Sequence, residues 1–287
     1  MKFGISTYSL WNVVRNEGRS FPDVIEWIAA NGGEHAEIVT FGLDLAENPR
    51  LAEELAQKAA ACGIELSNYA ISADFASNDQ EDFERELARV KREVDVARTL
   101  GVKRMRHDVA MRPPAAATVR QYMADFERLV TACRAIADYA APYGIVTSVE
   151  NHGFHVQGSE RVQALIHAVD RENFRTTIDI GNFLCVDEDP VVAVRRNIPY
   201  ASMIHLKDFY VRRSSRDPGE GFFQTAGGNF LRGAIVGHGD IDMVEVLRTI
   251  KSSGYSGYIS LEFAGLEDCR LGARLGLENA KRIWEQL

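Results

Sequence analysis

Short apolar runs alternate along the chain with longer segments in which apolar residues recur every three or four positions. The short runs are typical of buried strands, and the longer spacing indicates amphipathic helices. Asn78 or Asp79 is suited to cap the start of the clearest helical segment, and Gly101 is suited to end it. One face of this segment is an apolar stripe, formed by Phe83, Leu87, Val90, Val94, Ala97 and Leu100.

The alternation produces eight strand-like runs, at residues 3–9, 36–39, 64–71, 104–110, 145–150, 175–180, 203–209 and 258–263. Helix-like segments separate them, at residues 21–31, 49–62, 79–101, 118–143, 159–169, 190–197, from about 242, and 267–284. Such a pattern indicates parallel strands joined by crossover helices, and eight units favour a closed barrel over an open sheet. We therefore predict an α/β fold in which residues 1–287 form a single (β/α)8 (TIM) barrel domain.

One segment, residues 212–239, does not fit this rhythm. It is long and rich in Gly, Arg and Ser, and it follows the seventh strand-like run. Long loops in compact domains usually cover a functional site or are disordered. We predict that residues 212–239 form a lid or substrate-binding loop over the active site.

Composition and charge limit the classes of function that the chain can have. Hydrophobic residues make up 46% of the chain and charged residues 26%, an ordinary globular balance. The net charge of −8 argues against a nucleic-acid partner, because phosphates call for a basic surface. No stretch approaches the roughly 20 apolar residues of a membrane span, and the N-terminus lacks the form of a signal peptide. We expect a cytoplasmic protein with no membrane partner.

The four cysteines are Cys62, Cys133, Cys185 and Cys269. They lie far apart in the sequence and form no C-x-x-C pair, which a redox or zinc motif would need. We interpret them as reduced residues that contribute to packing.

Four consecutive predicted strands end in residues that can bind a metal. Chemistry in such barrels lies at the carboxyl ends of the strands, so neighbouring tips converge on one patch. Crowded carboxylates raise one another's pKa values, and a divalent cation removes that cost. The donors suit one divalent metal ion, for which we favour Mn²⁺ over Mg²⁺, Co²⁺, Fe²⁺ or Zn²⁺. The predicted ligands are Glu150, Asp179, His205 and Glu262.

These strand ends form motifs that resemble the xylose-isomerase-like superfamily of sugar-phosphate isomerases and epimerases. The motifs are Ser148-Val149-Glu150-Asn151-His152, Thr177-Ile178-Asp179-Ile180-Gly181-Asn182, His205-Leu206-Lys207-Asp208, Gly237-His238-Gly239-Asp240-Ile241-Asp242, and Gly254 to Glu262. The resemblance is strong in the C-terminal half, whereas the N-terminal half matches in its alternation of strand-like and helix-like segments and at Glu37. It implies that Glu150 and Glu262 act as acid and base in addition to binding the metal. It also implies a homodimer or homotetramer.

The resemblance implies a divalent-metal-dependent isomerase or epimerase that acts on a sugar or keto-sugar. Removal of a proton beside a carbonyl would pass through a metal-stabilised enediolate, with one carboxylate as base and the other as acid. The first alternative is a lyase on the same site, of the inosose-dehydratase or keto-glycoside-cleaving type. A second is a phosphodiesterase of the AP-endonuclease type, which needs three zinc ions and a fuller set of His and Asp ligands. A third is a barrel subunit without catalysis.

Five further residues are candidates for substrate binding, because they follow strand ends or lie in the long segment. They are His107, Asn182, Lys207, Arg232 and His238. Asn182 stands where ketose 3-epimerases usually have a histidine, so a simple ketose substrate is not expected. We predict that His152 supports the site or its loop rather than binding the metal.

Overall fold

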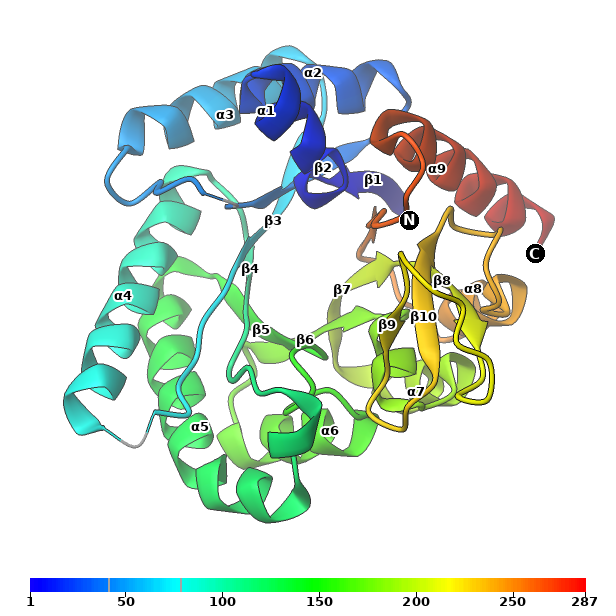
Figure 1. Ribbon diagram of the computed structural model, residues 1–287. Helices are drawn as coiled ribbons and strands as arrows, with labels where there is room; N and C mark the ends of the chain where they lie inside the picture. Colours follow the sequence, from blue (N-terminus) through cyan, green and yellow to red (C-terminus); the bar gives the residue numbers. More distant parts are fainter. Residues whose placement is uncertain (41, 78) are drawn as a thin grey trace.

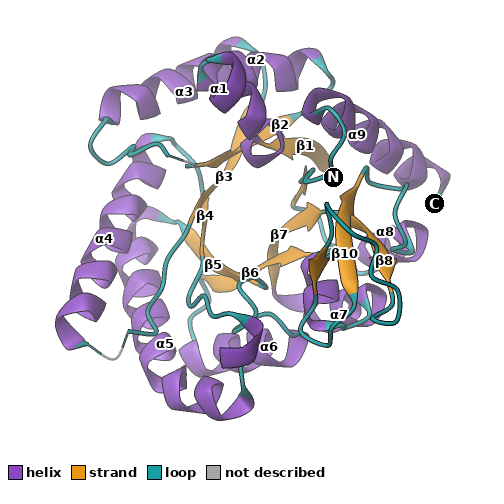
Figure 2. Cartoon of the chain, in the orientation of Figure 1, coloured by secondary structure: helices purple, strands orange, loops and turns teal. Residues whose placement is uncertain are grey.

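The barrel is built from β1 (Lys2–Ser6), β2 (His35–Val39), β3 (Glu65–Ile71), β4 (Arg104–His107), β5 (Val146–Glu150), β6 (Phe174–Asp179), β7 (Ala201–Leu206) and β11 (Tyr258–Leu261). The computed structural model describes residues 1–40, 42–77 and 79–287. Within these residues the strands close in the order β1-β11-β7-β6-β5-β4-β3-β2, and every neighbouring pair is parallel. Figure 1 and Figure 2 show the strands as an inner ring enclosed by helices, which confirms the predicted (β/α)8 barrel.

The outer ring consists of the predicted helices, whose bounds are α2 (Phe21–Ala30), α3 (Pro49–Ala61), α4 (Gln80–Thr99), α5 (Val119–Ala140), α6 (Ser159–Val169), α7 (Pro190–Asn197), α8 (Met243–Ser252) and α9 (Cys269–Gln286). Short 3-10 helices connect some elements, at η1 (Thr7–Leu10), η2 (Pro114–Ala116), η3 (Ala141–Tyr143), η4 (Asn182–Val186) and η5 (Ile198–Tyr200). In the described ranges, no helix combines the length and the apolar character needed to cross a bilayer.

The first strand is shorter than its sequence suggests. We predicted a strand over residues 3–9, but β1 ends at Ser6, whose hydroxyl accepts a hydrogen bond from the Tyr8 amide (3.4 Å) and starts η1. A further helix, α1 (Trp11–Glu17), follows and was not predicted. A serine hydroxyl that bonds to the backbone two residues on competes with strand pairing, which explains the early end.

The start of α4 shows how local polar residues fix an element. The Asp79 carboxylate accepts a hydrogen bond from the Asp82 amide (2.9 Å), which caps the helix as predicted. Asn78, the alternative cap, lies outside the described residues. Beyond the cap, Val90, Val94 and Ala97 of the apolar stripe are fully buried in the core between barrel and helices.

The long segment after the seventh strand is not an irregular loop. It contributes to a three-stranded antiparallel sheet in the order β8-β10-β9, formed by β8 (Asp208–Arg212), β9 (Phe223–Gln224) and β10 (Phe230–Ala234). The predicted run 203–209 therefore divides between β7 and β8. Figure 1 shows this sheet beside the end of β7. β8 begins two residues after β7 ends, and β10 contains Arg232 and Gly233, so neither strand forms a separate apolar run in the sequence.

The cysteines are free, as predicted, and Cys133 and Cys185 are buried. Cys133 packs in the main apolar core. Cys185 packs with Phe209 and Leu231 beneath the small sheet, so it links that sheet to the barrel.

Gly4 lies where β1 passes close to β2, and the fold depends on its lack of a side chain. A Cβ at Gly4 would lie 2.1 Å from the His35 carbonyl oxygen and 2.6 Å from the His35 ring. Because backbone cannot yield, Gly4→Ala should lower the free energy of unfolding by about 1–3 kcal/mol. The control is Gly158→Ala, whose Cβ would meet no atom closer than 3.8 Å. Denaturant titration of both variants checks this, and equal stabilities would contradict it.

Candidate metal centre

Four neighbouring strands bring the predicted ligands together. Glu150 is the last residue of β5 and Asp179 the last of β6, while His205 lies in β7 and Glu262 directly follows β11. In the barrel these strands are adjacent, in the order β11-β7-β6-β5. All four side chains are buried, and one donor atom from each lies within 4.8 Å of the others. The convergence at the carboxyl ends of the strands therefore takes place as the sequence predicts.

His205 is oriented by a carboxylate from the opposite wall of the barrel. Its Nε2 lies 2.9 Å from Glu37 Oε1 on β2, and Asn68 Nδ2 donates to the same oxygen (2.7 Å). His205 Nδ1 is then directed toward Glu262 Oε1 (3.4 Å) and Glu150 Oε2 (3.7 Å). This nitrogen is buried and makes no hydrogen bond within the described residues. A histidine held at one nitrogen by a carboxylate presents the other to a metal.

Asp179 is fixed by the turn that follows β6. Its Oδ1 accepts hydrogen bonds from the amides of Gly181 and Asn182, both at 2.9 Å. The Asn151 side chain pairs with the Asp179 backbone, accepting from its amide (2.8 Å) and donating to its carbonyl (2.7 Å). The remaining oxygen, Oδ2, faces the cluster. Asn151, which directly follows Glu150, thus holds the carboxyl ends of β5 and β6 together.

Two further cations neutralise the cluster. Arg106 Nε of β4 lies 2.7 Å from Glu150 Oε2. Lys207 Nζ lies 2.7 Å from Asp179 Oδ2 and 2.8 Å from Glu262 Oε2. Lys207, predicted as a substrate-binding residue, therefore forms ion pairs with two of the predicted ligands. Both cations are nearly as buried as the carboxylates that they contact.

The charges shift the pKa values of the ligands in different directions. Burial raises the pKa of Glu150, although Arg106 and His205 oppose that shift. Burial also acts to raise the pKa of Glu262, but Lys207 and His205 outweigh it and hold this pKa at about 2. For His205, burial is outweighed by the carboxylates of Glu37, Glu262 and Glu150, which raise its pKa to about 10. Without a metal, His205 is thus a cation at neutral pH.

The donor set fits a divalent cation. Three carboxylates and one imidazole are ligands that Mn²⁺, Fe²⁺, Co²⁺ and Zn²⁺ accept. The unbonded His205 Nδ1 points into the space between two of the carboxylates. A buried polar atom without a partner is costly unless something binds it. Glu150, Asp179, His205 and Glu262 are therefore the residues that would hold the ion.

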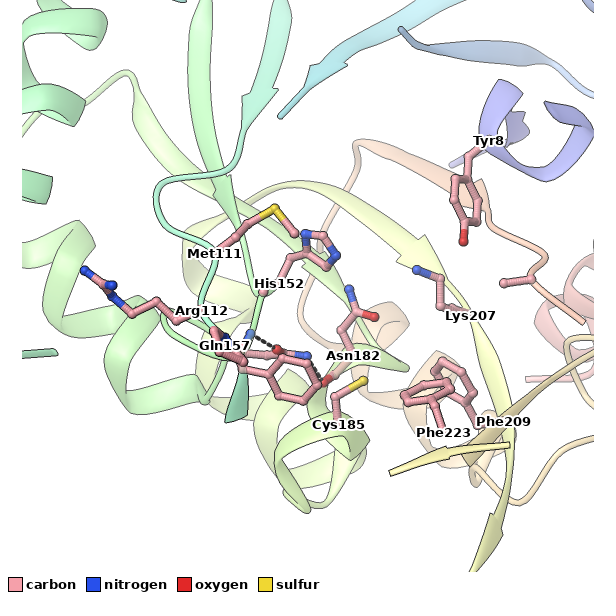
Figure 3. Close-up of a pocket in the computed structure, with 14 residues that line it drawn as sticks. Tyr8, Met111, Arg112, His152, Gln157, Asn182, Cys185, Lys207, Phe209 and Phe223 are labelled. Atoms are coloured by element: carbon pink, nitrogen blue, oxygen red, sulfur yellow. Dashed lines mark hydrogen bonds between the residues drawn. The ribbon is translucent and has the colours of Figure 1, made fainter. Parts of the chain in front are cut away.

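A cavity of about 530 Å³ opens beside the cluster and is shown in Figure 3. Asn182 and Lys207, two of the predicted substrate-binding residues, line it. Asn182 Nδ2 also donates to Glu150 Oε1 (3.0 Å), so it connects the cavity to the cluster. Phe223, from the segment predicted to cover the site, lines the cavity as well.

The other three predicted substrate-binding residues do not line this cavity. His107 is fully buried, with its ring 6.0 Å from that of Phe75, and burial lowers its pKa to about 4. Its neighbour Arg106 points toward Glu150, and successive strand residues point to opposite faces. His107 therefore packs on the outer side of the barrel wall.

Arg232 and His238 lie on the small sheet and its following turn. The Arg232 guanidinium stacks over the Tyr210 ring at 4.7 Å. His238 is exposed. The turn around it is held by Asp208 Oδ2, which accepts from the amides of Gly237 and Gly239, both at 2.9 Å. The matching Lys-Asp and Gly-His-Gly motifs are therefore bonded to each other.

His152, which was predicted to support the site or its loop, lines the cavity, and its Nδ1 lies 3.1 Å from Asp108 Oδ1. Sequence reasoning missed two residues that contact the predicted ligands. Glu37 was noted only as a match, although a lone carboxylate inside the apolar run 36–39 is itself a signal. No local pattern marks Arg106 as the partner of Glu150.

Comparisons with known proteins agree with this architecture. Inosose dehydratase from Bacillus velezensis is 28% identical over 143 residues, which are 48% of this chain and 47% of that protein. The chain thus matches about half the length of its curated relatives. Two solved structures share the fold. The IOLI protein with a binding zinc atom has a TM-score of 0.75 at 20% identity, covering 99% of this chain and 96% of that one.

The second solved structure is the 3-keto-D-glucoside 4-epimerase YcjR from E. coli, with a TM-score of 0.73 at 16% identity. It covers 98% of this chain and 99% of its own. The model of the xylose isomerase-like TIM barrel family matches residues 25–283, which is most of the chain and includes all four ligands. The chain therefore belongs to the xylose isomerase-like TIM barrel family.

Proposed function

We propose that this protein is a divalent-metal-dependent epimerase or isomerase that breaks a C–H bond beside the carbonyl of a sugar-like substrate. The main support is the position of Glu150 and Glu262, which come from β5 and β11, the two outer strands of the four that carry the predicted ligands. One carboxylate oxygen of each lies near His205 Nδ1, at 3.7 Å and 3.4 Å. A cavity large enough for a sugar opens beside them. Epimerase relatives of the same fold support this reading.

The metal would be held by Glu150, Asp179, His205 and Glu262. We infer Mn²⁺, because imidazole makes pure Mg²⁺ less suitable and three carboxylates make a soft-metal site less suitable. Zn²⁺ is the alternative that the zinc-bound IOLI structure supports. When bound, the ion supplies a Lewis acid for negative charge that develops on the substrate's carbonyl and hydroxyl oxygens.

The two glutamates would move the proton. One carboxylate takes it from the carbon beside the carbonyl, and the other returns a proton, as general base and acid. Return to the opposite face of the same carbon gives an epimer, and return to the neighbouring carbon gives an aldose–ketose isomer. Asn182 holds Glu150 and Lys207 holds Glu262, so each proton carrier has a partner that also faces the cavity.

A lyase on the same site is the second candidate, and the match to inosose dehydratases supports it. Its first step is the same removal of a proton. If a hydroxyl or an alkoxyl group is β to the carbonyl, the electron pair can expel it and form a double bond instead of taking a proton back. The mass of the product distinguishes the two: epimers and isomers keep it, whereas dehydration lowers it by one water.

Incubation of the Mn²⁺-loaded protein in heavy water with a panel of keto-sugars tests the proposal directly. We expect deuterium to enter the substrate at the carbon beside the carbonyl, as measured by NMR and mass spectrometry. Metal removed with a chelator should abolish the exchange, and added Mn²⁺ should restore it. Exchange that continues in protein shown by elemental analysis to hold no metal would refute the proposal.

Glu150→Gln and Glu262→Gln should each reduce kcat by at least about 10²- to 10⁴-fold, the usual contribution of a general acid or base. Glutamine keeps the size of the side chain but cannot take a proton. Metal content is measured in each variant, so that loss of proton transfer is separated from loss of the ion. Glu278→Gln, in an exposed ion pair on α9, is the matched control and should leave kcat unchanged. Near-normal kcat in either site variant would remove that glutamate from the mechanism.

Glu37→Gln should weaken metal binding by about 10- to 100-fold, because it removes the charge that orients His205. Glutamine can still accept a hydrogen bond from His205 Nε2, so the fold should persist. Isothermal titration with Mn²⁺ measures the affinity. Glu34→Gln, which changes an exposed carboxylate directly before the same strand, serves as the control. Unchanged affinity in Glu37→Gln would contradict this role.

Metal binding should strengthen as pH rises from 6 to 9. His205 in the metal-free protein has a pKa raised to about 10, so it must lose a proton before Nδ1 can bind the metal. One displaced proton corresponds to about a tenfold gain in affinity per pH unit. The stability of the metal-free protein should change in the opposite direction and fall as pH rises. The charged His205 stabilises the fold fully below its unfolded pKa, and this contribution is lost as pH rises through its folded pKa of about 10. Mn²⁺ titrations across this range check the first trend, and a flat affinity would overturn it.

A further inference from the structure

The cavity beside the metal ligands has two chemically different ends. Near the cluster, its wall consists of polar side chains, among them Asn182, Lys207 and His152. Figure 3 shows the rings of Phe209 and Phe223 side by side, below Lys207 in this view. Cys185 and Phe154 also line the cavity, and Met111 adds apolar surface on the opposite side, beside His152.

Large apolar side chains line this end of the cavity. Phe209 and Phe223 meet edge to face, with ring centroids 5.8 Å apart and planes at 78°. Phe223 is 43% exposed and Met111 is 47% exposed, so both leave apolar surface uncovered at the rim. Exposed apolar residues gathered in a hollow are typical of a ligand-binding surface.

Phe154 is held in this wall against its backbone preference. Its φ is +63°, a conformation that a bulky aromatic residue rarely adopts. The buried Gln157 keeps it there, accepting from the Phe154 amide (2.5 Å) and donating to the Asn182 carbonyl (2.6 Å). Such strain persists only where the surroundings impose it, and it gathers at binding sites. Through Gln157, the apolar wall is tied to the residue that contacts Glu150.

The strand that carries Phe223 is also anchored. Asp187 at the end of η4 accepts hydrogen bonds from Thr225 Oγ1 (2.8 Å), the Gly227 amide (2.6 Å) and Asn229 Nδ2 (2.7 Å). These bonds fix the β9–β10 hairpin to the barrel. The apolar wall is therefore preformed, which lowers the entropy that a ligand loses on binding.

We propose that the substrate is a sugar that carries a flat apolar substituent, such as an aromatic aglycone, bound by Phe223, Phe209, Phe154 and Met111. This rests on the proposed function for the sugar end. A free sugar can place the C–H face of its ring on one aromatic side chain, but its hydroxyl groups beside the rest of the apolar wall would lose their hydrogen bonds to water without replacement. A sugar with an aromatic group matches both ends, with its hydroxyls toward Asn182 and Lys207.

The test compares phenyl β-D-glucoside with methyl β-D-glucoside, ligands that share the sugar and differ in the substituent. The Kd of each for the full-length Mn²⁺-loaded protein is measured by calorimetry. We expect the phenyl compound to bind at least about tenfold more tightly, because its ring covers the apolar wall. Equal affinities, or no binding of the phenyl compound, would overturn the proposal and leave the apolar wall as a cover for the sugar itself.

Variants assign the preference to this wall. Phe223→Leu and Met111→Ala should each reduce the ratio of the two Kd values by about threefold or more, since they remove flat or apolar contact area. Met123→Ala is the matched control, because Met123 is 70% exposed on α5 and does not line the cavity. Its ratio should equal that of the wild type, and circular dichroism checks that all variants fold. A ratio unchanged in both cavity variants would overturn the assignment.

Binding of these glucosides needs no turnover, so the two proposals fail separately. If the protein prefers the phenyl ligand but catalyses no deuterium exchange with any keto-sugar, the apolar subsite is supported and the proposed reaction is refuted. If the protein exchanges deuterium into free keto-sugars but does not prefer the phenyl ligand, the reaction is supported and the subsite is refuted.

Discussion

The constraint on which the site depends is the repulsion between buried carboxylates. Glu150, Asp179 and Glu262 offer oxygens within 4.8 Å of one another, far from solvent. Like charges at that distance are unfavourable in a medium of low dielectric constant, so positive charge must accompany them. Arg106 and Lys207 supply part of it at 2.7–2.8 Å, and the protonated His205 supplies more. A divalent ion held by His205 Nδ1 would displace that proton and bring two positive charges in place of one.

Barrel closure explains why one patch can hold so much charge. Consecutive strands β5, β6 and β7 bring their ends together with β11, while β2 reaches His205 from across the barrel through Glu37. Hydrogen bonds between strand tips, such as those of Asn151 with Asp179, keep the donors from moving apart. The rigid strands thus fix the distances that metal binding needs, and the surrounding loops remain free to shape the cavity.

The sequence predicts the barrel and the ligands for the same reason: both are local patterns repeated at regular intervals. Each ligand stands at the end of an apolar run, so its place follows from strand position alone. Partners distant in sequence are harder to find. Glu37 meets His205 across 168 positions, and no pattern near Arg106 indicates Glu150. His107 illustrates the opposite error, because a polar residue at a strand end was expected to face the cavity and instead packs against Phe75. The small sheet escaped prediction because β8 runs on almost directly from β7 and β10 is interrupted by Arg232 and Gly233.

On the proposed function, chemistry and specificity reside on different parts of the chain. The strands carry the four predicted ligands, which would do the chemistry, whereas Phe209, Phe223 and Phe154 come from segments that follow strand ends and would select the substrate. Loops of this kind change with little cost to the barrel that supports them. A relative can then retain the residues at the strand ends and accept a different substrate, and because one fold supports many reactions, family membership by itself determines neither the reaction nor the substrate. On the proposed function, the apolar half of the cavity is where this protein would distinguish one substrate from another.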